Sequence, residues 1–518
     1  MRHKPPIIQL AIILIFVLST SISSARALMQ VLPQHHSLEK ISINSAQTEL
    51  IVQPRAIADD PNLSCYKTVD EFYAIADSWV TENPGFVEWI DIGDSWEKTQ
   101  DSDTGYDIKV LVLTNEIITE EKPILFLMSG LHARELAPVE LNLRFAEYLL
   151  ENYGTDADVT WLLDYREIHL LFVANPDGRI IAEDQAASGE DPFGERAWYT
   201  NTNTSACAIG DERYGVDLDR NFPVAWEDGS AIPCEEFYRG TSANSEPETQ
   251  AIINYLDTLF SDEEVKVKSL FINLRSYGNQ IFWPYGYIPD SPPDESALIN
   301  LGHRFAFYNQ YTPVQLGDIS TSVSGAVDDY VYETLDIATF TFNIGTYKEG
   351  GFFTFCNYFE DYILSDNLEA LIYAAKVADA PYETPFGPDI TDLNVNLIKV
   401  NEETSFQVTA YVTDSQYYPF GMEVQNIYLV RYSIDTPPWE LTGSIDIEQP
   451  KDGDYDSPNE EIEISFASDH LDYGRHILYM QGQDTTDQWG PVSTKYFENE
   501  EPPPIEEDKL IFLPIIFK

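Results

Sequence analysis

The hydrophobic positions of this chain change their period near residue 380. Before that point, stretches with apolar residues at helical spacing alternate with short apolar runs typical of buried strands. The helical stretches are 68–80, 136–153, 246–260 and 295–308. The strand-like runs are 108–114, 123–128, 167–174, 268–274 and 338–343. Such alternation predicts an α/β domain with a largely parallel or mixed sheet over residues 62–380.

A different pattern follows residues 381–388, which hold three prolines and predict a linker. From 389 to 498, short runs of alternating apolar and polar positions are separated by turn residues, which predicts an all-β sandwich domain. These runs are 405–412, 424–432, 461–465 and 476–483. Residues 474–479 and 487–490 are similar to the last strands of immunoglobulin-like modules in secreted enzymes, which bind or act as spacers. Residues 499–518 form an acidic, proline-rich linker and an apolar tail, interpreted as a sorting tag or an edge strand.

The N-terminus has the layout of a secretory signal. A basic start (2–4) precedes an apolar run (7–17), and residues 25–27 offer a small-residue cleavage site. The alternative, a membrane anchor, needs about 20 apolar residues, and this run is shorter. We therefore predict a signal peptide at 1–27 and a leader or linker at 28–61. The mature chain is expected to be secreted or extracellular, with cell-surface attachment as an alternative and without a transmembrane segment.

Charge and cysteine content narrow the choice of partners and compartment. The formal net charge is −57, which excludes nucleic acid as a partner because phosphate binding needs a surplus of Lys and Arg. The chain has four cysteines, Cys65, Cys207, Cys234 and Cys356. An even count suggests two disulfides in an oxidising compartment. Thiol metal binding is the weaker alternative, because no CxxC pair is present.

His132 and Glu135 are the first candidates for chemistry. They lie in the segment GLHARE, directly after the strand-like run 123–128 and before the helical stretch 136–153. An imidazole and a carboxylate three residues apart at a strand end can bind one Zn²⁺. The same spacing also fits a surface loop with a capping Glu. The neighbouring segments of the sequence therefore decide between a metal site and a loop.

That context resembles the carboxypeptidase A-like zinc peptidases. The similar segments, in order, are GLHARE (130–135) to HxRE, NPDG (175–178), GVDLDRNF (215–222) to GVDLNRNF, YRG (238–240), SEPET (245–249) and FWPYG (282–286). The resemblance covers about residues 62–380 and implies a carboxypeptidase-like α/β/α sandwich around a mixed eight-stranded sheet. It also implies zinc, removal of C-terminal residues from peptides and a Cys207–Cys234 disulfide. A Cys65–Cys356 disulfide stays open.

The metal-ligand set departs from the family pattern at one position. His132 and Glu135 match two zinc ligands, but the third position holds Arg275. Arginine is always cationic and has no lone pair for a metal. His303, on a predicted helix, and His169, within a strand, do not replace the missing histidine. Zinc is therefore expected from the family but not supported by this ligand set.

Two catalytic positions depart as well. The general-base position holds Asn343, which cannot accept a proton at neutral pH. The position of the arginine that polarises the scissile carbonyl holds Tyr199. Loss of a general base alone typically costs about 10²–10⁴-fold in rate.

The substrate-binding positions are mixed. The pair that grips the substrate carboxylate is Asp219 and Arg220, so the arginine is kept. Ser320 stands where a tyrosine covers bound substrate, and Val327 stands where side-chain preference is set. An apolar residue at that position favours apolar C-terminal residues.

These departures lead to one hypothesis and three possible functions. Without zinc, Glu135 would be a buried unpaired carboxylate, so we expect an Arg275–Glu135 ion pair in place of the metal. The first function is a pseudo-peptidase whose cleft binds peptide or protein C-termini. The second is an active zinc carboxypeptidase with an unusual ligand set. The third is a cell-surface or adhesion protein that acts through its β-sandwich.

Overall fold

The computed structural model describes residues 57, 60–208, 214–319, 323–400, 403–417, 424–440, 445–447 and 449–500. The predicted signal peptide and the apolar tail lie outside these ranges, as does nearly all of the predicted leader. Within them, every helix is too short or too polar to cross a bilayer.

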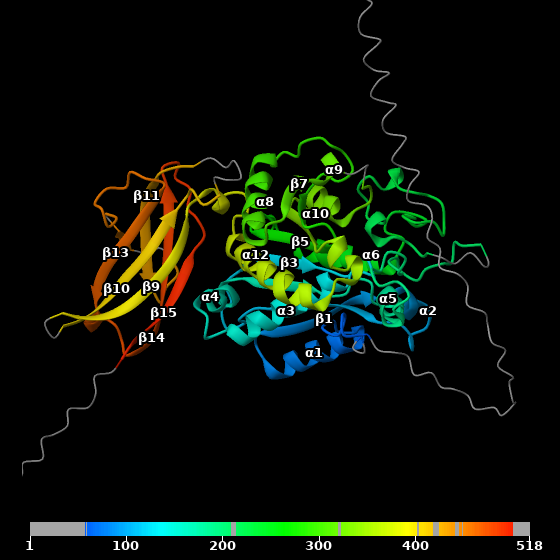
Figure 1. Ribbon diagram of the computed structural model, residues 1–518, viewed down its shortest axis with the longest axis horizontal. Coiled ribbons are helices and arrows are strands. Elements are labelled where there is room, and N and C mark those ends of the chain that lie inside the picture. The colour runs from blue at the N-terminus through cyan, green and yellow to red at the C-terminus, as the bar shows by residue number, and fades with distance from the viewer. Residues whose placement is uncertain are drawn as a thin grey trace, which may run out of the picture. The chain divides into compact units, whose positions relative to one another are not determined.

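A mixed sheet forms the centre of the larger domain (Figure 1). Its strands are β1 (Val87–Asp94), β2 (Asp107–Leu113), β3 (Ile124–Met128), β4 (Glu167–Leu171), β5 (Ser269–Ser276), β6 (Gln280–Trp283), β7 (Thr312–Gln315) and β8 (Ala338–Ile344). The spatial order is β1-β2-β4-β3-β5-β8-β6-β7. The central strands β4, β3, β5 and β8 run parallel, while β2 and β6 pair antiparallel with their neighbours β4 and β8. The predicted eight-stranded mixed sheet is confirmed.

The side chains of β3 show why both faces of this sheet are covered. Successive strand residues point to opposite faces. Leu125 and Leu127 join one hydrophobic core, whereas Ile124, Phe126 and Met128 join another. A strand that is apolar throughout therefore needs helices on both sides, which is the α/β/α arrangement expected.

The helices divide between the two cores (Figure 1). The first core includes α1 (Val69–Glu82), α3 (Leu136–Asn152), α4 (Ala157–Tyr165), α5 (Pro176–Ser188), α8 (Glu295–Asn309) and α12 (Leu364–Val377). The second includes α6 (Pro247–Leu259) and α10 (Val327–Leu335). The shorter helices are α2 (Trp96–Gln100), α7 (Glu263–Val267), α9 (Leu316–Ile319) and α11 (Cys356–Tyr358).

Residues 175–178 correct one expectation from the sequence. The segment NPDG predicts a turn, but it begins helix α5. The Asn175 side chain accepts a hydrogen bond from the backbone N–H of Gly178, and Pro176 occupies the first turn of the helix. Both residues are as favourable at a helix N-terminus as in a turn, so the local sequence does not separate the two structures.

The C-terminal strands form two antiparallel sheets, as the all-β prediction requires. One sheet has the order β13-β10-β9, with β9 (Asp389–Val400), β10 (Glu403–Thr413) and β13 (Asn459–Ala467). The other has the order β12-β11-β14-β15, with β11 (Ile427–Ile434), β12 (Ile445–Ile447), β14 (Gly474–Asp484) and β15 (Ser493–Asn499). Alternate residues of β10 and β14, among them Val408 and Met480, fill the core between the sheets.

Two disulfides tie the larger domain together. Cys207 pairs with Cys234, which confirms the pairing implied by the family resemblance. Cys65 pairs with Cys356, the pairing left open by the sequence, and so joins the segment before α1 to α11.

Removing the Cys65–Cys356 disulfide by paired Cys→Ala changes should lower the free energy of unfolding by about 5 kcal/mol. The bond spans 291 residues, and a longer closed loop removes more entropy from the unfolded chain. Cys207–Cys234 spans 27 residues, so the same change there should cost about 2 kcal/mol less. Equilibrium unfolding in urea measures both losses. A larger loss from the shorter loop would contradict the expectation.

Candidate functional site

His132 and Glu135 lie in the loop that connects β3 to α3. Gly130, with φ of +67°, lets this loop turn sharply beneath Phe172 and Val173. The loop brings His132 Nδ1 to 2.9 Å from Glu135 Oε1. On its other side, His132 Nε2 lies 3.0 Å from Asp217 Oδ1. The imidazole is therefore held between two buried carboxylates.

Arg275, near the C-terminal end of β5, is the centre of the site. Its Nε donates to Glu135 Oε2 at 3.1 Å, so the expected ion pair is present. Its Nη1 donates to Asp219 Oδ2 at 2.7 Å, and its Nη2 lies 2.7 Å from His132 Nδ1. One guanidinium thus contacts all three side chains, with a separate nitrogen for each.

Burial and charge compete in this cluster. Burial acts to raise the pKa of Glu135, but Arg275 and His132 outweigh it and hold that pKa below its ordinary value. Burial also acts to raise the pKa of Asp217, and His132 and Arg220 reverse the effect. Burial and Arg275 lower the pKa of His132, but its two carboxylate neighbours leave it above its ordinary value. The carboxylates of Glu135 and Asp217 therefore both depend on neighbouring positive charge to stay ionised.

His132 has one protonation state that fits its contact with Arg275. Its Nδ1 can accept a hydrogen bond from the guanidinium when it carries a lone pair. Nε2 then carries the proton and donates to Asp217. Protonation of Nδ1 would exchange the Arg275 contact for a hydrogen bond to Glu135.

The residues around Arg275 do not fit a catalytic metal ion. Such a site normally offers three protein ligands with free lone pairs. Here His132 and Glu135 both contact a cation that has no lone pair of its own. Among the described residues, no group of three or more His, Cys, Asp or Glu side chains has the geometry to hold a metal.

Asp219 and Arg220 lie on a short 3₁₀ helix, Leu218–Arg220, which Asp217 caps through the backbone N–H of Asp219. The Asp219 carboxylate turns toward Arg275 and also accepts from the backbone N–H of Val327 at 3.3 Å. Arg220 Nη1 donates to the carbonyl of Asp219 at 2.7 Å and lies 3.6 Å from its Oδ2. Arg220, which is always cationic, therefore shares the Asp219 carboxylate with Arg275.

Asn343 and Tyr199 take part in structural contacts. Asn343 pairs with Arg275 across β8 and β5, and its Nδ2 donates to the carbonyl of Tyr277 at 3.0 Å. Tyr199 is buried, and its hydroxyl accepts from the backbone N–H of Phe237 at 2.9 Å. Burial, followed by the charge of Asp217, raises the pKa of Tyr199, so this hydroxyl stays neutral.

These side chains border a cavity of about 240 Å³. Its lining includes His132, Arg134, Glu135, Asp219, Arg220, Arg275, Ser276, Phe282, Leu316, Val323, Asp328, Thr341, Asn343 and Phe352. Val327 does not line it, because its side chain is fully buried in the second core. Its role in side-chain preference therefore stays a prediction without support from this geometry. Ser320 lies outside the described residues.

Asp328 lies on the cavity wall and was not singled out from the sequence. It is 8% exposed, and its Oδ2 accepts from Asn273 Nδ2 at 3.3 Å. Within the described part of the chain, its Oδ1 has no hydrogen-bond partner. Burial, and then the neighbouring Asp219, raise the pKa of Asp328 to about 7. Asp328 and Asp329 are adjacent in the sequence, and this pair was the signal that could have identified the position as a candidate.

Asp217 is the other site residue that sequence reasoning missed. It belongs to the segment GVDLDRNF, where attention fell on Asp219 and Arg220. A carboxylate that accepts the second N–H of a histidine commonly fixes the tautomer of that ring. The spacing of 85 residues from His132 hides this relation in the sequence.

Comparisons with known proteins agree on one family. Residues 72–368 match the family model described as zinc carboxypeptidase. Mouse carboxypeptidase A2 is 30% identical over 314 residues, which span 59% of this chain and 68% of that protein. Human carboxypeptidase A1 is 30% identical over 302 residues, which span 57% of this chain and 66% of that protein.

Solved structures show the same likeness. Bovine thrombin-activatable fibrinolysis inhibitor, in complex with tick carboxypeptidase inhibitor, is 25% identical with a TM-score of 0.50. That match covers 60% of this chain and 97% of the other. Carboxypeptidase A from Helicoverpa armigera, at 24% identity and a TM-score of 0.51, shows the shared fold over 60% of this chain and 73% of its own.

Replacing Arg275 with Met should destabilise the protein by about 3–5 kcal/mol at pH 7, because it leaves buried carboxylates without their cation. The sign of the pH dependence should also reverse. In the unmodified chain the lowered pKa of Glu135 contributes stability above about pH 4.5, and this is lost as the pH falls through the folded-state value. In the variant, burial acts without Arg275 and raises that pKa, so stability is present at low pH and is lost as the pH rises.

Chemical denaturation between pH 3 and pH 8 measures both effects. Lys451→Met is the control, since Lys451 forms an exposed ion pair with Glu461 on the C-terminal sheets. It should leave the shape of the profile unchanged. An Arg275→Met variant that stays as stable as the control at pH 7 would show that the guanidinium is not needed.

Proposed function

The chain belongs to the zinc carboxypeptidase family, and we propose that it is a member in which an internal cation replaces the metal. In this proposal the cleft binds the C-termini of peptides or proteins and does not hydrolyse them. The protein is secreted, and the cleft rather than a catalytic centre is its working part.

One observation carries the proposal, namely the contact of the Arg275 guanidinium with His132, Glu135 and Asp219. A side chain already supplies a positive charge where zinc would bring its own. A metal ion at the same donors would meet a fixed positive charge about 3 Å away, which is strongly repulsive in a buried site. Binding zinc would require Arg275 to leave its three partners.

The positions that would perform hydrolysis support the same proposal. Asn343 donates its amide N–H to Tyr277 and has no carboxylate with which to take a proton from water. Tyr199 is neutral, buried and hydrogen-bonded to the backbone of Phe237, so it cannot supply a positive charge to a carbonyl. General-base and electrostatic catalysis are each worth orders of magnitude in rate.

The cavity retains features suited to a peptide C-terminus. Arg134 and Arg220 lie on its wall and offer positive charge to a carboxylate. Asp328 lies on the same wall and brings a carboxyl group to it. A C-terminal residue with a free carboxylate and a basic side chain matches both, so we propose peptides that end in Arg or Lys as ligands. This replaces the apolar preference that Val327 suggests.

The purified mature chain should contain well under one zinc per molecule after dialysis against trace zinc. The Arg275→His/Asn343→Glu double variant restores the family ligand and base, so it should take up about one zinc per chain. Elemental analysis measures both, with Glu135→Ala added to the double variant as the control that loses the metal. One tightly held zinc in the unmodified chain would favour the active-enzyme alternative.

A peptide that ends in Arg with a free carboxylate should bind at least about tenfold more tightly than its C-terminal amide, which corresponds to about 1.4 kcal/mol. Arg220→Ala should remove this difference. Asp328→Asn should remove the preference for Arg over Leu at the last position and leave carboxylate dependence intact. Isothermal titration calorimetry measures each, with Lys451→Met as a control. Equal affinity of the unmodified chain for all three peptides would contradict the proposal.

A further inference from the structure

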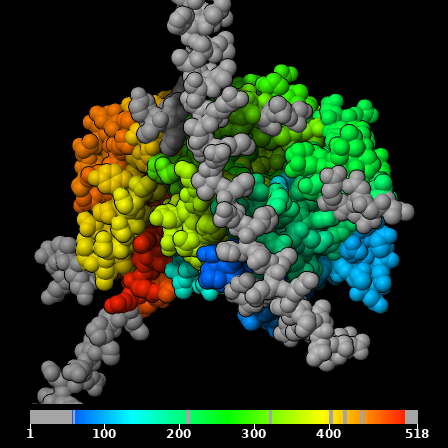
Figure 2. All heavy atoms as spheres, turned by 45° about the vertical axis from the view of Figure 1, so that its right-hand side comes forward, coloured from blue at the N-terminus to red at the C-terminus, as the bar shows by residue number. Residues whose placement is uncertain are grey.

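The contact between the C-terminal sheets and the helices α4, α8 and α12 is built like the interior of one domain. Tyr479 and Val492, which lie on and after β14, belong to the same hydrophobic core as α3, α4 and α12. In Figure 2 the red atoms of the last strands lie directly beside cyan atoms, in agreement with the contact between β15 and α4. The two parts therefore share apolar surface that neither would bury alone.

A buried ion pair crosses this contact. Arg304 of α8 is 3% exposed and Asp389 of β9 is 5% exposed. Arg304 Nη1 donates to Asp389 Oδ2 at 2.8 Å, and its Nη2 donates to the carbonyl of Gly387 at 3.2 Å. The ring of Tyr417 stacks at 4.1 Å from the same guanidinium. Removing either charge would leave the other buried and unpaired, which is far more costly than losing a surface pair.

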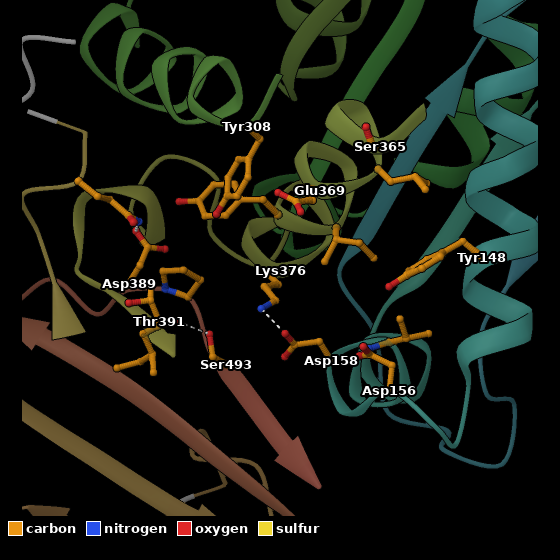
Figure 3. A pocket seen from close by; sticks show the side chains of 17 residues that line it. Tyr148, Asp156, Asp158, Tyr308, Ser365, Glu369, Lys376, Asp389, Thr391 and Ser493 are labelled. Atoms are coloured by element: carbon orange, nitrogen blue, oxygen red, sulfur yellow. Dashed lines mark hydrogen bonds and ion pairs between the residues drawn. The ribbon is translucent and has the colours of Figure 1, made fainter. Parts of the chain in front are cut away.

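A second set of polar contacts joins the two parts of the chain beside a cavity of about 420 Å³ (Figure 3). Asp158 of α4 accepts hydrogen bonds from both the backbone N–H and the hydroxyl of Thr494 on β15, at 3.0 and 2.8 Å. Lys376 of α12 points toward Asp158 and donates to its other oxygen at 2.6 Å. The carboxylate is thus shared between the two parts of the chain.

The predicted linker 381–388 is also fixed to the larger domain. The carbonyl of Pro385 accepts from Asn300 Nδ2 of α8 at 3.0 Å, and Pro385 itself is buried. A linker with such contacts does not act as a free hinge. From the C-terminal sheets, Trp439 in the segment between β11 and β12 lies near the rings of Trp161 and Tyr165, with centroids 5.8 and 5.4 Å apart.

We propose that the C-terminal β-sandwich is an integral folding partner of the helical face α4–α8–α12, and that the two parts unfold as one cooperative unit. Domains within one chain move relative to each other by default, unless their interface is large and apolar. Here shared core residues and a buried ion pair remove that freedom. The sandwich is therefore part of the scaffold that holds the cleft, in contrast to a detachable binding or spacing module.

Thermal unfolding of the full chain, followed by hydrogen exchange and mass spectrometry, tests this proposal. Val408→Ala weakens the sandwich core at a fully buried site that lies in a separate cluster from the contact. It should lower the unfolding temperature of β10 and of α3 by the same amount, about 3 °C or more. Val139→Ala, in α3, is the matched change in the larger domain and should also move both signals. A β10 signal that shifts alone would overturn the proposal.

A second variant tests the contacts themselves. Asp389→Asn combined with Thr494→Val removes the charge of the buried pair and the hydroxyl hydrogen bond to Asp158, and leaves the backbone bond of residue 494 in place. The unmodified full chain should show a single calorimetric transition, and this variant should separate it into two. A single transition at an unchanged temperature would show that these contacts do not couple the two parts, and would also overturn the proposal.

Discussion

The guanidinium of Arg275 determines how the other charged side chains of the cleft are arranged. Glu135 and Asp219 are nearly inaccessible to water, and an isolated carboxylate in such a place is unfavourable enough to drive either protonation or rearrangement. A single planar cation with several donors satisfies both carboxylates and still reaches His132. The imidazole then turns its second N–H to Asp217, which extends the hydrogen-bonded network of the cleft to that carboxylate.

The parallel centre of the sheet makes this convergence possible. Strands β3, β5 and β8 lie side by side and run in the same direction, so the residues that follow or end each strand meet at one edge. His132 comes from the loop after β3, Arg275 from the end of β5 and Asn343 from the end of β8. The register of the sheet places Arg275 directly opposite Asn343. The order and direction of the strands therefore bring these three positions together at one edge of the sheet.

Much of this could be predicted from the sequence, because it depends on local pattern. The run 123–128 and the helix after it are apolar at the expected period, and the ordered motifs identify the fold and the Arg275–Glu135 pair. What could not be predicted depends on neighbours distant along the chain. Asp217 and Asp328 gain their roles from His132 and the cavity, and Asn175 is as acceptable in a turn as at the start of α5. Strand β12, with three residues, is too short for periodicity to distinguish it from a loop.

The ion pair in the cleft also bears on which substitutions this site could accept one at a time. Histidine at position 275, without a bound metal, would leave buried acidic groups without their cation. Glutamate at position 343 would place another negative charge opposite Arg275. Selection on stability alone would therefore tend to hold Arg275 and its acidic partners together, so that none of them drifts independently of the others.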